Sequence, residues 1–257
     1  MTMSAWLRIY RAETRCECLK LVRTPMYVAS TLLFPLIFYV FFGLLMGSSM
    51  SVGALPVARY ILATYGAFGV VAATLFGLGV TLAVERGLGW LELKQASPMP
   101  PGAYLAAKAT ACLLLGAVGM ALLFLLGALG GGVRMPAAEW LLLGGSLVAG
   151  ALPFCALGLA IGYFAGPSSA PAIINIIYLP MAFCSGLWVP IDFLPKAIQQ
   201  AATALPAYHL AQIGLRVLDG PARGTLAGHA GALVGFALLF GGLAWIGHRR
   251  QQERIYG

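Results

Sequence analysis

Residues 85–108 read ERGLGWLELKQASPMPPGAYLAAK, and this polar stretch separates two long apolar blocks of the chain. It begins with Glu85 and Arg86, continues through Trp90, and returns to apolar sequence after Lys108. A short helix with Trp and Leu on one side and charges on the other would lie at a membrane-water interface, with its polar face open to a soluble partner. The alternative interpretation is a solvated loop that connects two membrane spans.

The composition is that of a membrane protein. Of the 257 residues, 60% are hydrophobic and 9% are charged, and the mean hydropathy is +0.88. Soluble domains contain about a quarter charged residues. The apolar runs are continuous, whereas the strands of a membrane barrel would alternate with a period of two. We therefore expect an all-α integral membrane protein.

Long apolar runs predict six transmembrane helices, because a bilayer requires about 20 apolar residues per span. The predicted spans are residues 26–46, 60–84, 104–129, 140–165, 170–189 and 226–247. Residues 1–24 precede them and place Arg8, Arg11 and Arg15 on one helical face, which favours an amphipathic interfacial helix. Charges this close to the N-terminus also argue against a cleaved secretory signal. The whole chain, 1–257, is expected to form one transmembrane domain.

Lysine and arginine are distributed unevenly between the two sides of these spans. Eleven of the 16 fall in the N-terminal segment, in residues 85–108 and in the C-terminal tail, and five fall on the other side. The positive-inside rule therefore predicts that both termini and residues 85–103 are cytoplasmic. Span ends and membrane lipid headgroups account for the net charge of +8, so we expect no nucleic-acid partner.

The segment 190–218 does not fit a simple loop between the last two spans. It is too apolar for free solvent, and it contains too many prolines to cross the bilayer. We predict a re-entrant pair of short helices that dip into the outer leaflet, which requires packing against protein or around a cavity. An interfacial helix outside the membrane is the alternative.

Together these features resemble the membrane subunit of an ABC-2 type exporter, over nearly the whole chain. The residues that carry the resemblance are Glu85-Arg86, Ser97-Pro98, Tyr104, Lys108, Ser185-Gly186-Leu187, Pro190, Leu194-Pro195 and Leu205-Pro206. The resemblance implies that residues 85–103 are a coupling region, containing a coupling helix, that docks on an ABC ATPase subunit. It also implies two membrane subunits, either two copies or a copy and a paralogue, with substrate passing between them along spans one, two and five.

The resemblance also assigns candidate site residues. The coupling residues are Glu85, Arg86, Leu88, Trp90, Leu91 and Glu92. The pathway candidates are Phe38, Phe68, Asn175, Tyr178 and Met181. The candidates for a re-entrant outer gate are Leu187, Trp188, Pro190, Pro195 and Pro206. Asn175 and Tyr178 carry the largest polar groups inside the spans, and such groups either face a pathway or hold helices together.

Several functional classes lack the residues that they require. The chain contains no G-x-x-x-x-G-K-[ST] motif, so we expect no cofactor on this chain and assign ATP and magnesium to the partner ATPase. Ionisable residues occur at span ends and not in the apolar interiors, which argues against an ion-coupled carrier. The five cysteines and three histidines follow neither a metal-site nor a disulfide pattern.

The resulting hypothesis is a non-catalytic permease subunit of an ATP-driven exporter in the bacterial plasma (inner) membrane, with a lipid, drug, glycan-lipid or peptide as substrate. Two alternatives remain open. One is a membrane scaffold without transport. The other is an intramembrane hydrolase that uses Ser185 with His209 or His229 as its base, although Cys184 occupies the place of an expected glycine.

Overall fold

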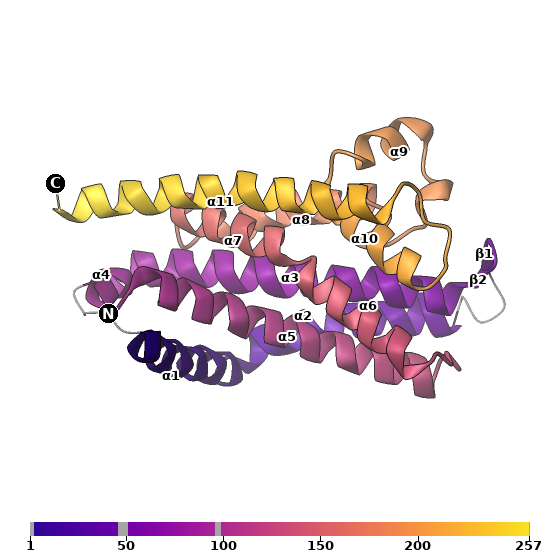
Figure 1. Cartoon of the computed structure of the whole chain (residues 1–257), viewed down its shortest axis with the longest axis horizontal. Helices are drawn as coiled ribbons and strands as arrows, with labels where there is room; N and C mark the ends of the chain where they lie inside the picture. Colours follow the sequence, from indigo (N-terminus) through magenta and orange to yellow (C-terminus); the bar gives the residue numbers. More distant parts are fainter. Residues whose placement is uncertain (1–2, 46–50, 96–98, 257) are drawn as a thin grey trace.

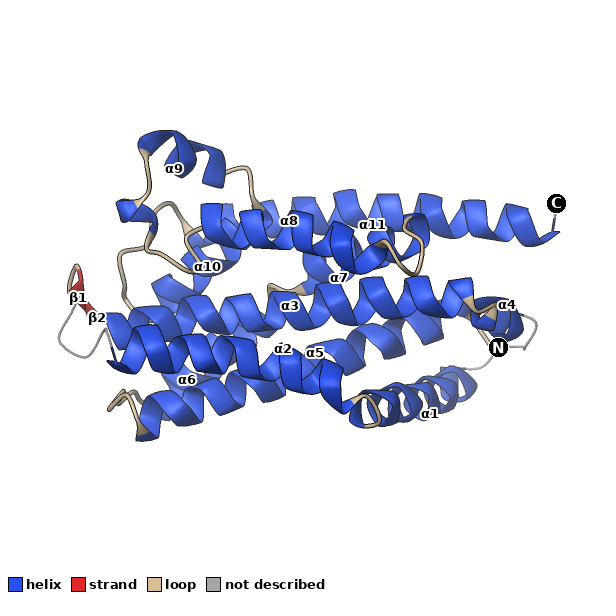
Figure 2. Ribbon diagram, turned by 180° about the vertical axis from the view of Figure 1, so that it is seen from behind, coloured by secondary structure: helices blue, strands red, loops and turns tan. Residues whose placement is uncertain are grey.

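The computed structural model describes residues 3–45, 51–95 and 99–256, and most of them are helical. The long helices run side by side along the long axis of the molecule (Figure 1). Both termini and α4 lie at one end, called the α4 end below, and α9 lies at the opposite end, called the α9 end (Figures 1 and 2). The expected all-helical class is confirmed, apart from a hairpin of two very short strands.

The elements differ widely in length, from two-residue strands to helices of 31 residues. In chain order they are α1 (Met3–Val22), α2 (Pro25–Phe38), the π-helix η1 (Tyr39–Leu45), β1 (Ser51–Val52), β2 (Leu55–Pro56), α3 (Val57–Gly87), α4 (Trp90–Gln95), α5 (Pro101–Leu129), α6 (Ala137–Ala149), α7 (Leu152–Phe164), α8 (Ala170–Cys184), the 3-10 helix η2 (Ile191–Phe193), α9 (Lys196–Ala202), α10 (Pro206–Val217) and α11 (Leu226–Tyr256).

Within the described chain, five helical segments are long and apolar enough to cross a membrane. They are Pro25–Leu45, Val57–Gly87, Gly102–Leu129, Ala137–Phe164 and Leu226–Glu253. An integral membrane protein is therefore supported, but the prediction of six spans is not confirmed. The remaining predicted span, 170–189, corresponds to the 15-residue helix α8. At 1.5 Å per residue α8 rises about 22 Å, which is less than the ~30 Å of the hydrocarbon core.

Helix α3 lies at the centre of the bundle. It packs against α2, α5, α7, α8 and α10, and 72% of its most apolar window is buried, compared with 11% for α11. The approach to α7 is close, because a Cβ added at Gly162 would lie only 2.8 Å from the Cβ of Leu82. Any displacement of α3 is therefore shared by the helices around it.

The end of α3 differs from the predicted end of the second span. The prediction ended the span at Val84, but α3 continues through Glu85 and Arg86 to Gly87. The chain then turns at Gly89, whose φ of +75° costs glycine little because it has no Cβ. Helix α4 is consequently only six residues long, so the expected surface helix does not include the Glu-Arg pair. Ser97 and Pro98 lie outside the described residues.

The segment 190–218 contains two short helices, α9 and α10. Helix α10 packs against α3, α6, α8 and α11 inside the bundle, whereas α9 projects at the α9 end (Figure 1). Most residues of α10 are buried, among them Tyr208 and Gln212. This packing meets the condition for irregular backbone at membrane depth. The depth of the segment in a bilayer stays a prediction.

Candidate functional site

Buried and half-buried charged side chains join four helices at the α4 end. The group, called the charge cluster below, contains three glutamates, three lysines and one tyrosine from α1, α3, α4 and α5, namely Glu13, Glu17, Lys20, Glu85, Lys94, Tyr104 and Lys108. The three negative and three positive formal charges cancel. Such cancellation is what allows ionisable groups to remain inside an apolar bundle.

Lys108 is the centre of the charge cluster. Its Nζ lies 2.9 Å from Glu17 Oε2 and 3.1 Å from Glu85 Oε2, and it donates to the hydroxyl of Thr81 at 3.1 Å. Lys108 is 2% exposed, and Glu17 and Glu85 are 4% and 7% exposed. The ammonium group therefore has two carboxylates and one hydroxyl as close polar partners inside the protein.

Lys20 links α1 to α3 on the more exposed side of the cluster. Its Nζ lies 2.6 Å from Glu17 Oε1 and 2.8 Å from Glu85 Oε1. Burial opposes the charge on Lys20, but the hydrogen bonds to Glu17 and Glu85 outweigh it and raise the pKa of Lys20. Lys20 is thus charged throughout the physiological pH range.

Helix α4 joins the same cluster through Lys94. Its ammonium group bonds to Glu13 of α1 and lies 4.0 Å from the ring centroid of Tyr104, a cation-π distance. The hydroxyl of Tyr104 in turn donates to Glu85. Helix α4 is therefore connected to α1, α3 and α5, although the chain breaks its helical path at Gly89.

These contacts assign the first two coupling candidates to the interior. Glu85 is held by Lys20, Tyr104 and Lys108, as described above. Arg86 donates to the backbone carbonyls of Tyr163 and Ala165, the latter at 2.6 Å, at the C-terminal end of α7. A guanidinium in this position satisfies carbonyls that have no partner within the helix. The pair therefore ties α3 to its neighbours and does not itself form an exposed docking surface.

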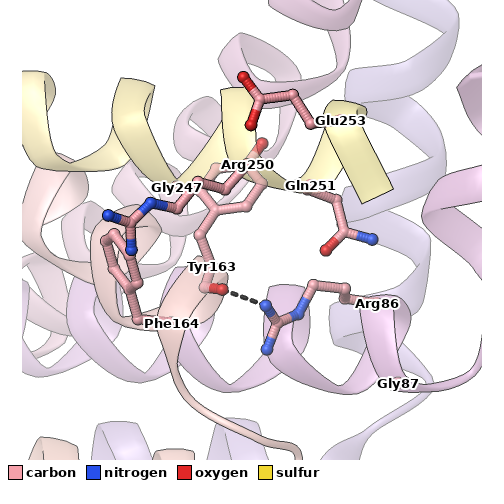
Figure 3. A pocket seen from close by; sticks show the side chains of 8 residues that line it. All are labelled: Arg86, Gly87, Tyr163, Phe164, Gly247, Arg250, Gln251 and Glu253. Atoms are coloured by element: carbon pink, nitrogen blue, oxygen red, sulfur yellow. Dashed lines mark hydrogen bonds between the residues drawn. The ribbon is translucent and has the colours of Figure 1, made fainter. Parts of the chain in front are cut away.

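A polar cavity of about 690 Å³ lies beside Arg86. Tyr163 and Phe164 of α7 line it together with Arg250, Gln251 and Glu253 of α11 (Figure 3). The guanidinium of Arg250 lies 5.9 Å from the ring centroid of Phe164. This cavity opens at the same end of the molecule as the charge cluster.

The exposed apolar surface around α4 includes three other side chains. Leu88, Trp90 and Leu93 are 63%, 49% and 73% exposed. Leu91, which was predicted to share a docking role, is 4% exposed and packs against Leu82, Tyr104 and Tyr163. Leu91 anchors α4 to the bundle, and Leu93, which the sequence analysis did not select, faces outward. Glu92 is exposed beside it.

A groove leads away from the charge cluster between α2, α3 and α8. An inner cavity of about 440 Å³ is bounded by Glu17, Lys20, Glu85 and Lys108 at the cluster and mostly by apolar side chains elsewhere. A second cavity of about 330 Å³ follows it. Tyr27 and Phe76 line both cavities, so the two are adjacent along the helices. We call this pair of cavities the α2-α3-α8 groove.

Aromatic side chains line the second cavity and extend beyond it towards the α9 end. The rings of Phe38 and Phe68 have centroids 6.2 Å and 5.6 Å from that of Trp188, and Phe68 stacks on Tyr178 at 4.9 Å. Phe34 continues the contact to Phe38. The structure therefore brings three pathway candidates together with one gate candidate in a single aromatic cluster.

The two polar pathway candidates lie in different surroundings. Tyr178 is 3% exposed and donates its hydroxyl to the backbone carbonyl of Phe68 at 2.9 Å, which joins α8 to α3. Asn175 is exposed, lines the second cavity, and donates to the carbonyl of Pro171 in its own helix at 3.1 Å. Met181 is buried in the core. Both residues line the second cavity, but Tyr178 also holds α8 to α3, whereas Asn175 bonds within its own helix.

The remaining gate candidates differ in how far they are buried. Leu187 and Pro206 are buried, Pro190 is half-buried, and Pro195 is exposed.

The hydroxyl of Ser185, the nucleophile of the hydrolase alternative, has no hydrogen-bond partner among the described residues. A serine nucleophile requires a base within hydrogen-bond reach, so the arrangement gives no support to a hydrolase.

The charge cluster is the feature that sequence reasoning missed. The sequence analysis counted Lys20 only among the basic residues of the N-terminal segment, and it assigned no role to Glu13 or Glu17. Their spacings of four and three residues place them on one helical face, which was the available signal. Their partners in α3 and α5 are distant in the sequence, so the pairing itself required the fold.

Comparison with known proteins agrees with this architecture. Residues 10–218 match the family described as ABC-2 type transporter. Over 203 residues the chain is 27% identical to a protein of Bacillus subtilis (strain 168) named "Putative transport permease YvfS". That alignment covers 79% of this chain and 82% of the relative.

Proposed function

The chain belongs to the ABC-2 type transporter family, and from that premise we propose that it is the permease subunit of an ATP-driven exporter. In this proposal the subunit has no catalytic activity of its own. Separate ATPase subunits bind ATP and magnesium, and a second permease subunit, either a copy or a paralogue, completes the transport pathway. Transport by this chain is the general role of the family.

The observation that carries the proposal is the charge cluster behind α4. Leu88, Trp90 and Leu93 offer an exposed apolar surface to a soluble partner, and Lys94 and Leu91 fix the same short segment to the bundle. When a partner displaces α4, the buried ion pairs transmit the displacement to α1, α3 and α5, because separating them would leave charges unpaired in apolar surroundings. This is the linkage that a coupling region requires.

The α2-α3-α8 groove supports the position of the pathway. Its walls are apolar and aromatic, with charged groups of the cluster at one end and Asn175 along its length. A groove of this character suits a lipid or an amphiphilic drug better than a polar peptide, because apolar walls cannot replace the hydration of a peptide backbone. The facing helices of a second subunit would enclose it.

We further propose six membrane crossings, with both termini and α4 in the cytoplasm of a bacterial inner membrane. The sixth crossing combines α8 with residues 185–189, and α10 fills the remaining depth beside it. The excess of lysine and arginine at the α4 end supports this orientation.

Co-purification and transport measured together test the proposal. The permease is expressed with the products of its neighbouring reading frames, among which we expect an ATPase with a P-loop. ATP-dependent movement of fluorescent lipids and drugs is followed in inside-out vesicles. The triple variant Leu88→Ala, Trp90→Ala, Leu93→Ala should lower both co-purification and transport at least about tenfold, because apolar anchors dominate interface energies.

A matched control comes from α11. Val234, Leu238 and Trp245 are 59%, 73% and 58% exposed, so their replacement by alanine removes a similar exposed apolar surface elsewhere. This control should retain both properties. Parent-level co-purification and transport in the α4 variant would disprove coupling through α4. A parent protein that binds the ATPase but moves no substrate would favour the scaffold alternative.

A further inference from the structure

Two of the three histidines face each other at the α9 end. His209 belongs to the first turn of α10, and His229 belongs to the first turn of α11. Their Nδ1 atoms are 2.8 Å apart, and their ring centroids are 5.1 Å apart. His229 is 5% exposed, whereas His209 is half-exposed. The contact therefore connects a re-entrant helix candidate to a membrane span, and one ring reaches the surface.

The other nitrogen of each ring defines how many protons the pair holds. His209 Nε2 lies 3.0 Å from the carbonyl oxygen of Thr203, and His229 Nε2 lies 2.5 Å from that of Arg223. A carbonyl oxygen can only accept a hydrogen bond, so both Nε2 atoms carry a hydrogen. A neutral imidazole has a single N–H. In two neutral rings, both Nδ1 atoms would therefore present lone pairs to each other.

One additional proton resolves this conflict. A proton on either Nδ1 forms a charge-assisted hydrogen bond to the other, and 2.8 Å is a normal length for such a bond. A second proton would place two N–H groups face to face and remove the bond. All the observed contacts are consequently satisfied when the pair holds one proton in addition to the two Nε2 hydrogens. They are not satisfied with no additional proton or with two.

The surroundings allow a single positive charge here. The ring of Tyr208 lies 5.4 Å from that of His209 and 5.9 Å from that of His229. The nearby cations are engaged elsewhere, since Arg223 pairs with Asp192 and Arg216 donates to the carbonyl of Gly224. Burial lowers the pKa of His209, the hydrogen bond to Thr203 raises it, and a positive charge on the neighbouring His229 ring would lower it. A proton on one ring therefore opposes a proton on the other.

We propose that His209 and His229 bind one proton between them, and that this shared proton fastens α10 to α11 at the α9 end. The proposal rests on the contacts of the pair and is independent of the transported substrate. As pH falls, the first proton tightens the joint, and a second proton at lower pH loosens it again. The joint is therefore strongest over an intermediate pH range.

Solid-state NMR of the full chain in lipid nanodiscs tests the proton count directly. His248 lies near the opposite end of α11, where its Nδ1 is 3.1 Å from the hydroxyl of Tyr163. In the variant His248→Gln, selective ¹⁵N labelling of histidine reports only the proposed pair, because the chain has three histidines. Lowering pH from about 9 to about 6 should change both Nδ1 signals in one step, with both Nε2 atoms protonated throughout.

Partner substitution and hydrogen exchange provide the second measurement. Amides in the first turns of α11 should exchange about tenfold more slowly when the single proton is bound, after correction for intrinsic pH dependence, and His209→Gln should abolish that change. His248→Gln should retain it. Two separate titrations, each unaffected by replacement of the other histidine, would overturn the proposal.

A metal ion is the competing occupant of two facing imidazole nitrogens. Zinc chloride added at about neutral pH should leave the Nδ1 signals unchanged if the pair holds a proton. If stoichiometric zinc shifts both signals, and His229→Gln removes the effect, the pair is a metal site and the shared proton is excluded.

Discussion

Lys108 of α5 and Glu85 of α3 form an ion pair of 3.1 Å although both side chains are almost completely buried. Glu17 of α1 approaches the same lysine from the other side at 2.9 Å. A buried charge is tolerated only beside its counter-charge, so each of the three groups depends on the others. Electrostatic contacts thus hold the polar helix α1 to α3 and α5, which are apolar over most of their length.

The first prediction concerns the removal of Lys108. Lys108→Met leaves Glu17 and Glu85 buried without their shared partner and should destabilise the protein by about 3–5 kcal/mol. The thermal unfolding of the detergent-purified protein measures this loss. Adding Glu85→Gln to the variant should recover part of it, because one of the unpaired charges is then removed.

Arg59 and Glu139 supply the matched comparison for that experiment. They form an ion pair at the ends of α3 and α6, but their side chains are 26% and 31% exposed. Arg59→Met should cost about 1 kcal/mol or less, because solvent screens a partly exposed pair. Equal losses from the Arg59 and Lys108 variants would contradict the special role of burial in the charge cluster.

The second prediction concerns pH. The raised pKa of Lys20 means that its stabilisation is complete below the usual lysine range and is lost only as pH rises through the higher folded-state value. Between about pH 6 and 9, Lys20 should therefore contribute no pH dependence to unfolding. Lys20→Gln should lower the unfolding temperature by the same amount at both ends of this range. A loss confined to one end would mean that Lys20 changes its charge there.

Composition was sufficient to predict the helical membrane class, because continuous apolar runs have few other solutions. The boundary at Glu85 was not predictable in the same way. Polar residues suggested that the span ends there, but Arg86 extends the helix by bonding to the end of α7, and Gly89 ends it by its positive φ. Both causes are tertiary or conformational, and neither appears in a hydropathy pattern.

The roles of Asn175 and Tyr178 were likewise left open by the sequence. Both are polar residues within one apolar helix, and their spacing of three residues places them near the same face. The difference arises from α3, which presents the carbonyl of Phe68 to Tyr178. Phe68 lies inside α3, and its residue type does not show that its carbonyl accepts a further hydrogen bond from a neighbouring helix, so only the packing separates the two roles.

The third prediction tests the orientation in the membrane. In a variant without native cysteines, Leu93→Cys at α4 and Phe193→Cys at the α9 end occupy positions that are 73% and 70% exposed. A membrane-impermeant maleimide should label the first only in inside-out vesicles and the second only in right-side-out vesicles, as the positive-inside rule requires. The reverse pattern would invert the proposed topology.

The fourth prediction separates the groove from the helix contacts. Asn175→Leu removes a polar group that faces the α2-α3-α8 groove and that hydrogen-bonds to a carbonyl of its own helix, so folding and assembly should be retained. Transport of polar or charged amphiphiles should change severalfold, because leucine at this position cannot form hydrogen bonds with their polar groups.

Tyr178→Phe keeps the ring on Phe68 but deletes the hydrogen bond between α8 and α3. It should lower stability by about 0.6–2 kcal/mol and leave substrate preference unchanged. Transport assays against a panel of amphiphiles, together with unfolding temperatures of both variants, provide the measurement. If Asn175→Leu unfolds the protein while Tyr178→Phe alters the substrate preference, the two roles are reversed. An unchanged substrate preference in both variants would contradict the groove as the pathway, because both residues line its second cavity.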